Sequence, residues 1–249
     1  PEAYRVILNR IYDDATTLVS GANAQAERMR MQLLSTGKIA ITANGEALDY
    51  DFKLPEEHVV KLDATDAWTN EDADILGFIE TAKETVAEST GADLTTMLMT
   101  KKTFNLLRTN KQIKALLNPL AVQSAVVTAP MVQQAVEGAT GMKIVTYDKR
   151  FRDEQGNTQK FFPDYVVTFL PDGTLGNTNY GTTPEEFDLQ SSSDHRANVQ
   201  VVNTGVAITT YKQEHPVNSK TIVSQIVMPS FEQADNVFIA TVAEEVETP

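Results

Sequence analysis

Histidine and cysteine are common in nucleophilic, acid–base and metal sites, and both are scarce in this chain. Its 249 residues contain three histidines and no cysteine, so disulfides, thiolate metal sites and cysteine nucleophiles are excluded. The histidines are His58, His195 and His215. None has a partner four residues away, as a helical zinc site needs. We therefore expect each histidine on the surface or in a turn.

Two other segments offer chemistry that the surrounding sequence does not support. Gly173–Gly176 could be a phosphate-binding loop, but no Gly-Lys-Ser/Thr follows it and we expect a loop next instead of a helix. Paired carboxylates could hydrolyse a glycosidic bond. The candidates are Asp63, Asp66, Asp72 and Asp74. Among 34 Asp and Glu residues, chance and helix capping explain them more simply. Nor is there a G-x-S-x-G nucleophile elbow. We expect no catalytic residue, metal or cofactor.

Composition is typical of a folded, acidic protein. Apolar residues make up 41% of the chain, and 21 Lys and Arg against 34 Asp and Glu leave a net charge of −13. This charge opposes non-specific binding to nucleic acid. We find no apolar run long enough to cross a membrane and no signal-peptide core, so we expect no membrane partner. The absence of cysteine suits a reducing cytoplasm. Because the chain starts at Pro1 without Met, we expect the protein's true start to be missing.

The first third of the chain predicts a helical segment followed by a hairpin. Helical periodicity runs over residues 5–35, in two pieces because 13–14 and 20–21 interrupt it, and Gly37 ends it. Its apolar stripe is Ala22, Ala26, Met29 and Leu33. Residues 38–54 then alternate with period two around Asn44-Gly45, the strongest short hairpin signal. The apolar positions of the hairpin are Ile39, Ile41, Leu48, Tyr50 and Phe52. Nothing local covers them, so we expect another subunit to do so.

Helices and strands are then expected to alternate. A helix over 69–90 should begin at the Thr69 cap, bury Ile75, Ile79, Ala82 and Val86, and stop near Gly91. Short helices should follow at 101–108, 111–117 and 130–137, with Phe104 and Leu107 inward. From residue 143 we expect mainly strands. They are 143–147, a strand at 165–170 buried on both faces, 199–211, 221–227 and 236–242, with a loop at 173–184.

Several stretches of the β-rich half resemble the signature of lambda-type phage major capsid proteins, the phage capsid protein E family. They are Phe162–Val167, Leu170–Gly176 and Tyr180–Glu185, and three further stretches agree in order, namely Leu33–Lys38, Met99–Phe104 and Met228–Asp235. The match covers about residues 25–242. Its motif positions outside the hairpin are Gly37, Pro163, Pro171, Gly173, Gly176, Tyr180, Gly181, Pro229 and Phe231.

The resemblance implies an α+β protein with the Hong Kong 97-type bacteriophage capsid fold. Residues 1–37 would be a helical remnant of an N-terminal arm, and 38–54 the extension-loop hairpin, including Asn44 and Gly45. Residues 55–92 would hold the spine helix of the peripheral domain, 93–212 the axial domain, and 213–249 the return to the peripheral domain and the C-terminal tail. Most of the family's N-terminal arm would precede residue 1.

It also implies the function of a structural major capsid, or head, protein of a tailed phage or prophage. Copies would self-assemble as pentamers and hexamers into an icosahedral shell that encloses DNA without sequence-specific binding, in the virion after assembly in the host cytoplasm. Decoration, scaffold and portal proteins are possible partners. Replacing Leu48, Tyr50 and Phe52 by Asp should leave a folded monomer and abolish shells. The alternatives are an encapsulin-like shell protein, a tail or neck component and, least favoured, a carbohydrate-active enzyme.

Overall fold

The chain forms two compact units. The structure, a computed structural model, describes residues 2–43, 46–117, 127–153, 155–191, 198–202, 205–213, 215 and 218–244. The smaller unit contains residues 1–30 and 176–230, and the larger unit contains residues 31–175 and 231–249. These borders do not coincide with the domain borders expected at residues 92 and 212. Residues 55–92 share the larger unit with residues 93–175.

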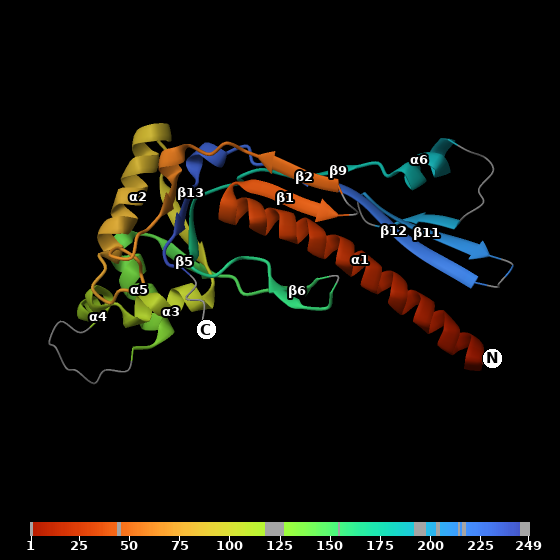
Figure 1. Cartoon of the computed structure of the whole chain (residues 1–249), viewed down its shortest axis with the longest axis horizontal. Helices are drawn as coiled ribbons and strands as arrows, with labels where there is room; N and C mark the ends of the chain where they lie inside the picture. Colours follow the sequence, from red (N-terminus) through yellow and green to blue (C-terminus); the bar gives the residue numbers. More distant parts are fainter. Residues whose placement is uncertain are drawn as a thin grey trace. The chain divides into compact units, whose positions relative to one another are not determined.

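Helix α1 (Glu2–Thr36) is one continuous helix of 35 residues, so the expected division into two pieces is wrong (Figure 1). A glycine such as Gly21 costs a helix interior only about 1 kcal/mol, which is too little to break a long helix. The predicted stripe is buried at Ala26, Met29 and Leu33. The predicted end is confirmed, because Gly37 has a φ of 70° and its N–H donates to the carbonyl of Leu33 at 2.8 Å.

A five-stranded sheet forms the centre of the larger unit. Its strands, in spatial order, are β3 (Val59–Lys61), β13 (Phe238–Thr241), β8 (Val166–Pro171), β4 (Leu94–Met99) and β5 (Lys143–Thr146). The pairs β3–β13 and β4–β5 are parallel, and β8 is antiparallel to both of its neighbours. The last described strand of the chain therefore lies inside this sheet.

Both faces of this sheet are covered. On one face Met97, Val167 and Phe238 belong to the main hydrophobic core. On the other face the hydroxyl of Thr168 donates to the carbonyl of Leu34 at 2.6 Å, which places the last turns of α1 against β8. The continuous apolar run predicted for β8 is thus confirmed, with Val166, Val167, Thr168 and Phe169 all buried.

Helices α2 (Ile75–Thr90), α3 (Lys101–Thr109), α4 (Lys111–Leu117) and α5 (Ala129–Thr140) lie on one side of the sheet (Figure 1). The stripe predicted for α2 is confirmed, because Ile75, Ile79, Ala82 and Val86 are fully buried, as is the stop at Gly91, which has a φ of 75°. The expected start at Thr69 is wrong. Asp74 is the cap, and its side chain accepts from the N–H of Gly77. Helix α5 likewise continues past residue 137, its expected end, to Thr140, and Gly141 caps it.

The smaller unit contains an antiparallel sheet with the strand order β10-β11-β12-β9. Its strands are β10 (Asn198–Val201), β11 (Val206–Gln213), β12 (Asn218–Pro229) and β9 (Thr178–Gly181), and α6 (Pro184–Ser191) follows β9. The loop expected over residues 173–184 therefore contains a strand, because β9 pairs with β12. The single strand expected over 199–211 is the pair β10 and β11, which fold back on each other.

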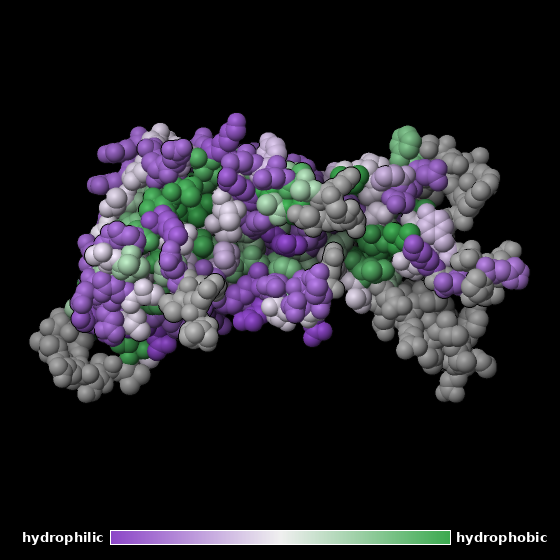
Figure 2. Space-filling model, in the orientation of Figure 1, coloured by the Kyte–Doolittle hydropathy of each residue, from purple (hydrophilic) through white to green (hydrophobic). Residues whose placement is uncertain are grey.

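The larger unit also contains several shorter elements. They are a 3-10 turn (Glu56–His58), another (Ala234–Asn236), and the ribbon of β6 (Arg150–Arg152) and β7 (Thr158–Lys160). Gly156, in the connection between these two strands, has a φ of 85°. On the visible face of this unit, hydrophobic surface shows as patches between hydrophilic side chains (Figure 2). Among the described residues, the helices are too short or too polar to cross a membrane.

Candidate functional site

The predicted hairpin is present as the antiparallel pair β1 (Lys38–Ala43) and β2 (Glu46–Asp51). Ile39 lies opposite Tyr50, and Ile41 lies opposite Leu48. Residues that face each other across an antiparallel pair project to the same side, so these four side chains form one apolar face. The predicted turn residues Asn44 and Gly45 lie outside the described residues.

Burial of this face differs between its two strands. Ile39 is fully buried, whereas Tyr50 is 50% and Leu48 47% exposed. Phe52 is only partly exposed, and its ring lies 6.0 Å from that of Phe231 and 4.8 Å from that of Tyr50, both edge-on. The expectation that nothing local covers the hairpin is therefore wrong for its base. The β2 side of the face, with Leu48 and Tyr50, is the part that offers an apolar surface to another molecule.

The base of the hairpin is held closely to the end of α1. Gly37 has a φ of 70°, which favours glycine, and a Cβ there would stand 2.5 Å from a methyl carbon of Leu54. The N–H of Phe52 donates to the carbonyl of Gly37 at 3.2 Å, and the Lys38 ammonium lies 2.9 Å from the Asp51 carboxylate. The hydrogen bond from Lys38 is the main cause that lowers the pKa of Asp51. This pair is exposed and contributes little to stability.

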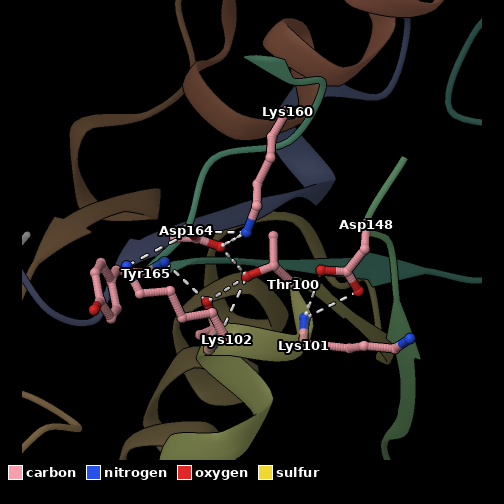
Figure 3. Close-up of polar contacts among 8 residues, drawn as sticks. Thr100, Lys101, Lys102, Asp148, Lys160, Asp164 and Tyr165 are labelled. Atoms are coloured by element: carbon pink, nitrogen blue, oxygen red, sulfur yellow. Dashed lines mark hydrogen bonds and ion pairs between the residues drawn. The ribbon is translucent and has the colours of Figure 1, made fainter. Parts of the chain in front are cut away.

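A second constellation lies where the chain enters β8. The carboxylate of Asp164 accepts two hydrogen bonds from the Lys160 ammonium, at 2.6 and 2.8 Å, and one from the Thr100 hydroxyl at 2.6 Å (Figure 3). Lys102 adds a longer ion contact at 3.8 Å. Burial raises the pKa of Asp164, but the hydrogen bonds and positive charges lower it by more, so the net pKa lies below its usual value.

Tyr165, the next residue, has a left-handed backbone with a φ of 62°, which is costly for a bulky residue. Its N–H donates to the Thr103 hydroxyl at 2.8 Å, and its carbonyl accepts the N–H of Val242 at 2.8 Å. The Lys102 ammonium stands 4.5 Å from the centre of its ring (Figure 3). These contacts hold the start of β8 to the N-terminus of α3 and to Val242, the residue after β13.

The motif positions are spread over both units and do not form one site. Gly37, Pro163, Pro171, Gly173 and Phe231 belong to the larger unit, and Gly176, Tyr180, Gly181 and Pro229 to the smaller one. At some of them the local structure favours glycine. Gly173 has a φ of 105°, and a Cβ on Gly181 would stand 2.7 Å from a methyl carbon of Ile226.

The residues considered for chemistry have structural roles. His58 lies in the 3-10 turn Glu56–His58, as one of the two expectations had it, but it is fully buried and not on the surface. Its Nε2 lies 2.7 Å from the Ser89 hydroxyl. His215 is exposed, and His195 lies outside the described residues. Asp74 caps α2, and Asp72 binds Lys111 at 2.8 Å. Within the described ranges no three His, Cys, Asp or Glu side chains gather as a metal site would require.

Sequence reasoning missed the attachment around Asp164. One local signal was present, because Lys160 and Asp164 are four residues apart with opposite charges. That spacing indicates contact only on a helix, and here the residues lie at a strand end and in a turn. The third partner, Thr100, is 64 residues away in sequence, and no local pattern predicts such a contact.

One protein family matches almost the whole chain. A family model described as Phage major capsid protein E matches residues 5–242. No curated protein matches the chain significantly. Among solved structures, the putative capsid protein of a prophage of E. coli CFT073 matches with a TM-score of 0.67 and 14% identity, over 93% of this chain and 66% of that one. A phage-related protein from Bordetella bronchiseptica RB50 matches with a TM-score of 0.54 and 13% identity, over 92% of this chain and 65% of that one. This chain thus spans slightly less than two thirds of each.

Proposed function

This chain belongs to the phage major capsid protein E family, and from that premise we propose that it is the head protein whose copies assemble into the icosahedral shell of a tailed phage or prophage. The role is structural, and we expect no catalytic activity. The observation that carries the proposal within the molecule is the hairpin, which is fixed at its base and exposes Leu48 and Tyr50 along β2.

The hairpin is suited to act as the extension loop that reaches a neighbouring copy. Exposed apolar side chains on a strand gain free energy when another surface covers them, at roughly 25 cal/mol per Å² of apolar area. One such contact is weak, but a closed shell repeats it in every copy, and repetition multiplies weak contacts into a stable assembly. Anchoring at Phe52 and Gly37 reduces the entropy lost when the loop docks.

The two compact units support a domain assignment that differs from the sequence-based one. The smaller unit contains an antiparallel sheet and most of α1. With 35 residues, α1 is a better candidate for the spine helix than α2, which has 16. In this assignment the smaller unit is the peripheral domain. The larger unit is the axial domain, whose loops would meet around the fivefold and sixfold axes.

The partners in this proposal are further copies of the chain, arranged as pentamers and hexamers. Decoration, scaffold and portal proteins are additional partners of such shells. The net charge of −13 suits an inner surface that encloses DNA without binding it tightly. Assembly would take place in the host cytoplasm and the product would be found in the virion.

Leu48→Asp and Ala47→Asp form a matched test of the hairpin. Both add one negative charge to an exposed position of β2, on opposite faces of the ribbon. Expressed in the full-length gene with any scaffold, Leu48→Asp should reduce the yield of particles in electron micrographs at least tenfold, while Ala47→Asp should assemble. The earlier triple change is less suitable, because Phe52 packs on Phe231. Normal particles from Leu48→Asp, with its charge on the docking face, would contradict the role of the hairpin.

A further inference from the structure

The two edges of the hairpin differ in how their backbone groups are satisfied. In an antiparallel pair, every second residue points its N–H and C=O away from the partner strand. The N–H of Phe52 donates to the carbonyl of Gly37, so residues 37 and 52 are a hydrogen-bonded pair. Because such pairs alternate along the ribbon, the facing residues 39 and 50, and 41 and 48, are hydrogen-bonded pairs as well. The backbone groups of Lys38 and Ala40 on β1, and of Ala47 and Asp49 on β2, therefore point outward.

Side chains from the last turn of α1 occupy the outer edge of β1. The Gln32 amide donates from Nε2 to the Ala40 carbonyl at 3.0 Å and accepts the Ala40 N–H at 3.2 Å through Oε1. One turn later the Thr36 hydroxyl accepts the Lys38 N–H at 3.2 Å. The same hydroxyl can donate a hydrogen bond to the carbonyl of Gln32 at 2.8 Å or to that of Lys38 at 3.1 Å. It has one proton and donates to one of them at a time.

The outer edge of β2 has no such cover. Among the described residues, nothing forms a hydrogen bond with the outward backbone groups of Ala47 and Asp49. This edge belongs to the same strand as the exposed Leu48 and Tyr50. An unpaired edge is a template for pairing with another strand.

We propose that Gln32 and Thr36 are positioning residues that take the place of a third strand along β1, and thereby confine strand addition by a second copy of this chain to the β2 edge. The closed edge is a property of the single chain, whereas the strand addition rests on the proposed function. Their spacing of four residues puts both side chains on one side of the helix end, and a primary amide has a donor and an acceptor, as a peptide group does.

Residue-resolved amide hydrogen exchange on the isolated chain tests the closed edge. Gln32→Met keeps the length of the side chain and removes the amide, and we expect the Ala40 amide to exchange about five- to tenfold faster, as loss of one hydrogen bond predicts. Thr36→Val should do the same at Lys38, and Thr36→Ser should restore the slow rate. The amides of Ile39 and Tyr50 should not change. An unchanged Ala40 rate, or an equal acceleration throughout the hairpin, would overturn the closed edge.

Asp49→Pro tests the open edge. Proline removes the outward N–H of Asp49 without removing a bond between β1 and β2, and it is tolerated on edge strands. With the full-length gene we expect Asp49→Pro to remain folded but to form at least tenfold fewer particles than Asp49→Ala, which keeps the N–H. Wild-type particles should also protect the Asp49 amide and leave the Ala40 amide as in the free chain. Full particle yield from Asp49→Pro would overturn strand addition at β2, whereas wild-type chains that form no particles would refute the proposed function alone.

Discussion

Asp164 holds its negative charge in a position where the side chain is only 11% exposed. Three hydrogen bonds, two from Lys160 and one from Thr100, satisfy it. They connect the turn before β8 to the N-terminus of α3, and the adjacent Tyr165 adopts its left-handed conformation there. A carboxylate in this position therefore stabilises the larger unit by fixing a costly backbone conformation.

Asp164→Asn should lower the free energy of unfolding by about 2–3 kcal/mol, because it removes charge-assisted hydrogen bonds and leaves the Lys160 ammonium without its partner. Urea unfolding at neutral pH measures this loss. Asp172→Asn is the control, since that carboxylate is exposed and has one described hydrogen bond, from Thr95. An equal loss in both variants would contradict a special role for Asp164.

The same carboxylate makes the stability of the wild-type chain depend on pH. Its pKa is lower in the folded state than the ordinary value of 3.8. A depressed pKa contributes stability that is fully present above the unfolded value and is lost as the pH falls through the folded value. The difference in unfolding free energy between wild type and Asp164→Asn should therefore be constant above about pH 5 and shrink below 3.8. Urea unfolding at several pH values measures it, and a difference that does not shrink between about pH 5 and pH 2 would contradict it.

Helix ends provide the clearest tests at the level of elements. Asp74 caps α2 through the N–H of Gly77 at 3.0 Å and also accepts from the Gln112 amide at 2.7 Å. Asp74→Ala should cost about 1–2 kcal/mol, whereas Thr69→Ala, at the cap expected from sequence, should cost less than about 0.5 kcal/mol. Chemical denaturation of both variants decides between the two positions, and a larger loss for Thr69→Ala would restore the sequence-based start.

The glycine inside α1 and the glycine that follows its end should respond to alanine with opposite signs. Gly37 has a positive φ and lies against Leu54, so Gly37→Ala should destabilise the chain by at least about 1–2 kcal/mol. Gly21 lies within the helix with open space around its Cα, and Gly21→Ala should stabilise it by about 0.5–1 kcal/mol. Thermal unfolding followed by circular dichroism measures both. Equal signs for the two would contradict the assigned helix end.

Local patterns predicted the interiors of elements better than their ends and partners. The stripe of α2 was predictable because its spacing alone decides which residues meet the core. The start of α2 was not predictable, because Thr69 and Asp74 are both suitable caps. The contact that distinguishes them, from the Gln112 amide to Asp74, joins residues far apart in sequence. Strand β9 has a loop-like composition and exists through pairing with β12, about 50 residues later. The hydrogen bonds of Gln32 to the edge of β1 likewise depend on where the hairpin lies relative to α1, and the spacing of residues within either element does not predict that position.

At the level of the whole chain, the two units are interleaved in sequence. The smaller unit takes residues from the start and from 176–230, and the larger unit is interrupted by that second segment. The boundaries expected from the resemblance followed sequence order and so divided the larger unit at residue 92. Compact units follow contacts, and the strands of the larger unit contact one another across this insertion.

The internal position of β13 has a consequence for how the protein is made. Strand β13 lies between β3 and β8, yet it is the last described strand to leave the ribosome. Until residue 241 has been synthesised, β13 is incomplete. The nascent chain then has β3 without a partner strand, and β8 is unpaired on the side that β13 will occupy. Contacts so distant in sequence form slowly, and the incomplete sheet is prone to pair with other chains. Prematurely terminated chains should therefore be unable to complete the fold, and they would be candidates for chaperone capture or proteolysis before they could enter an assembly.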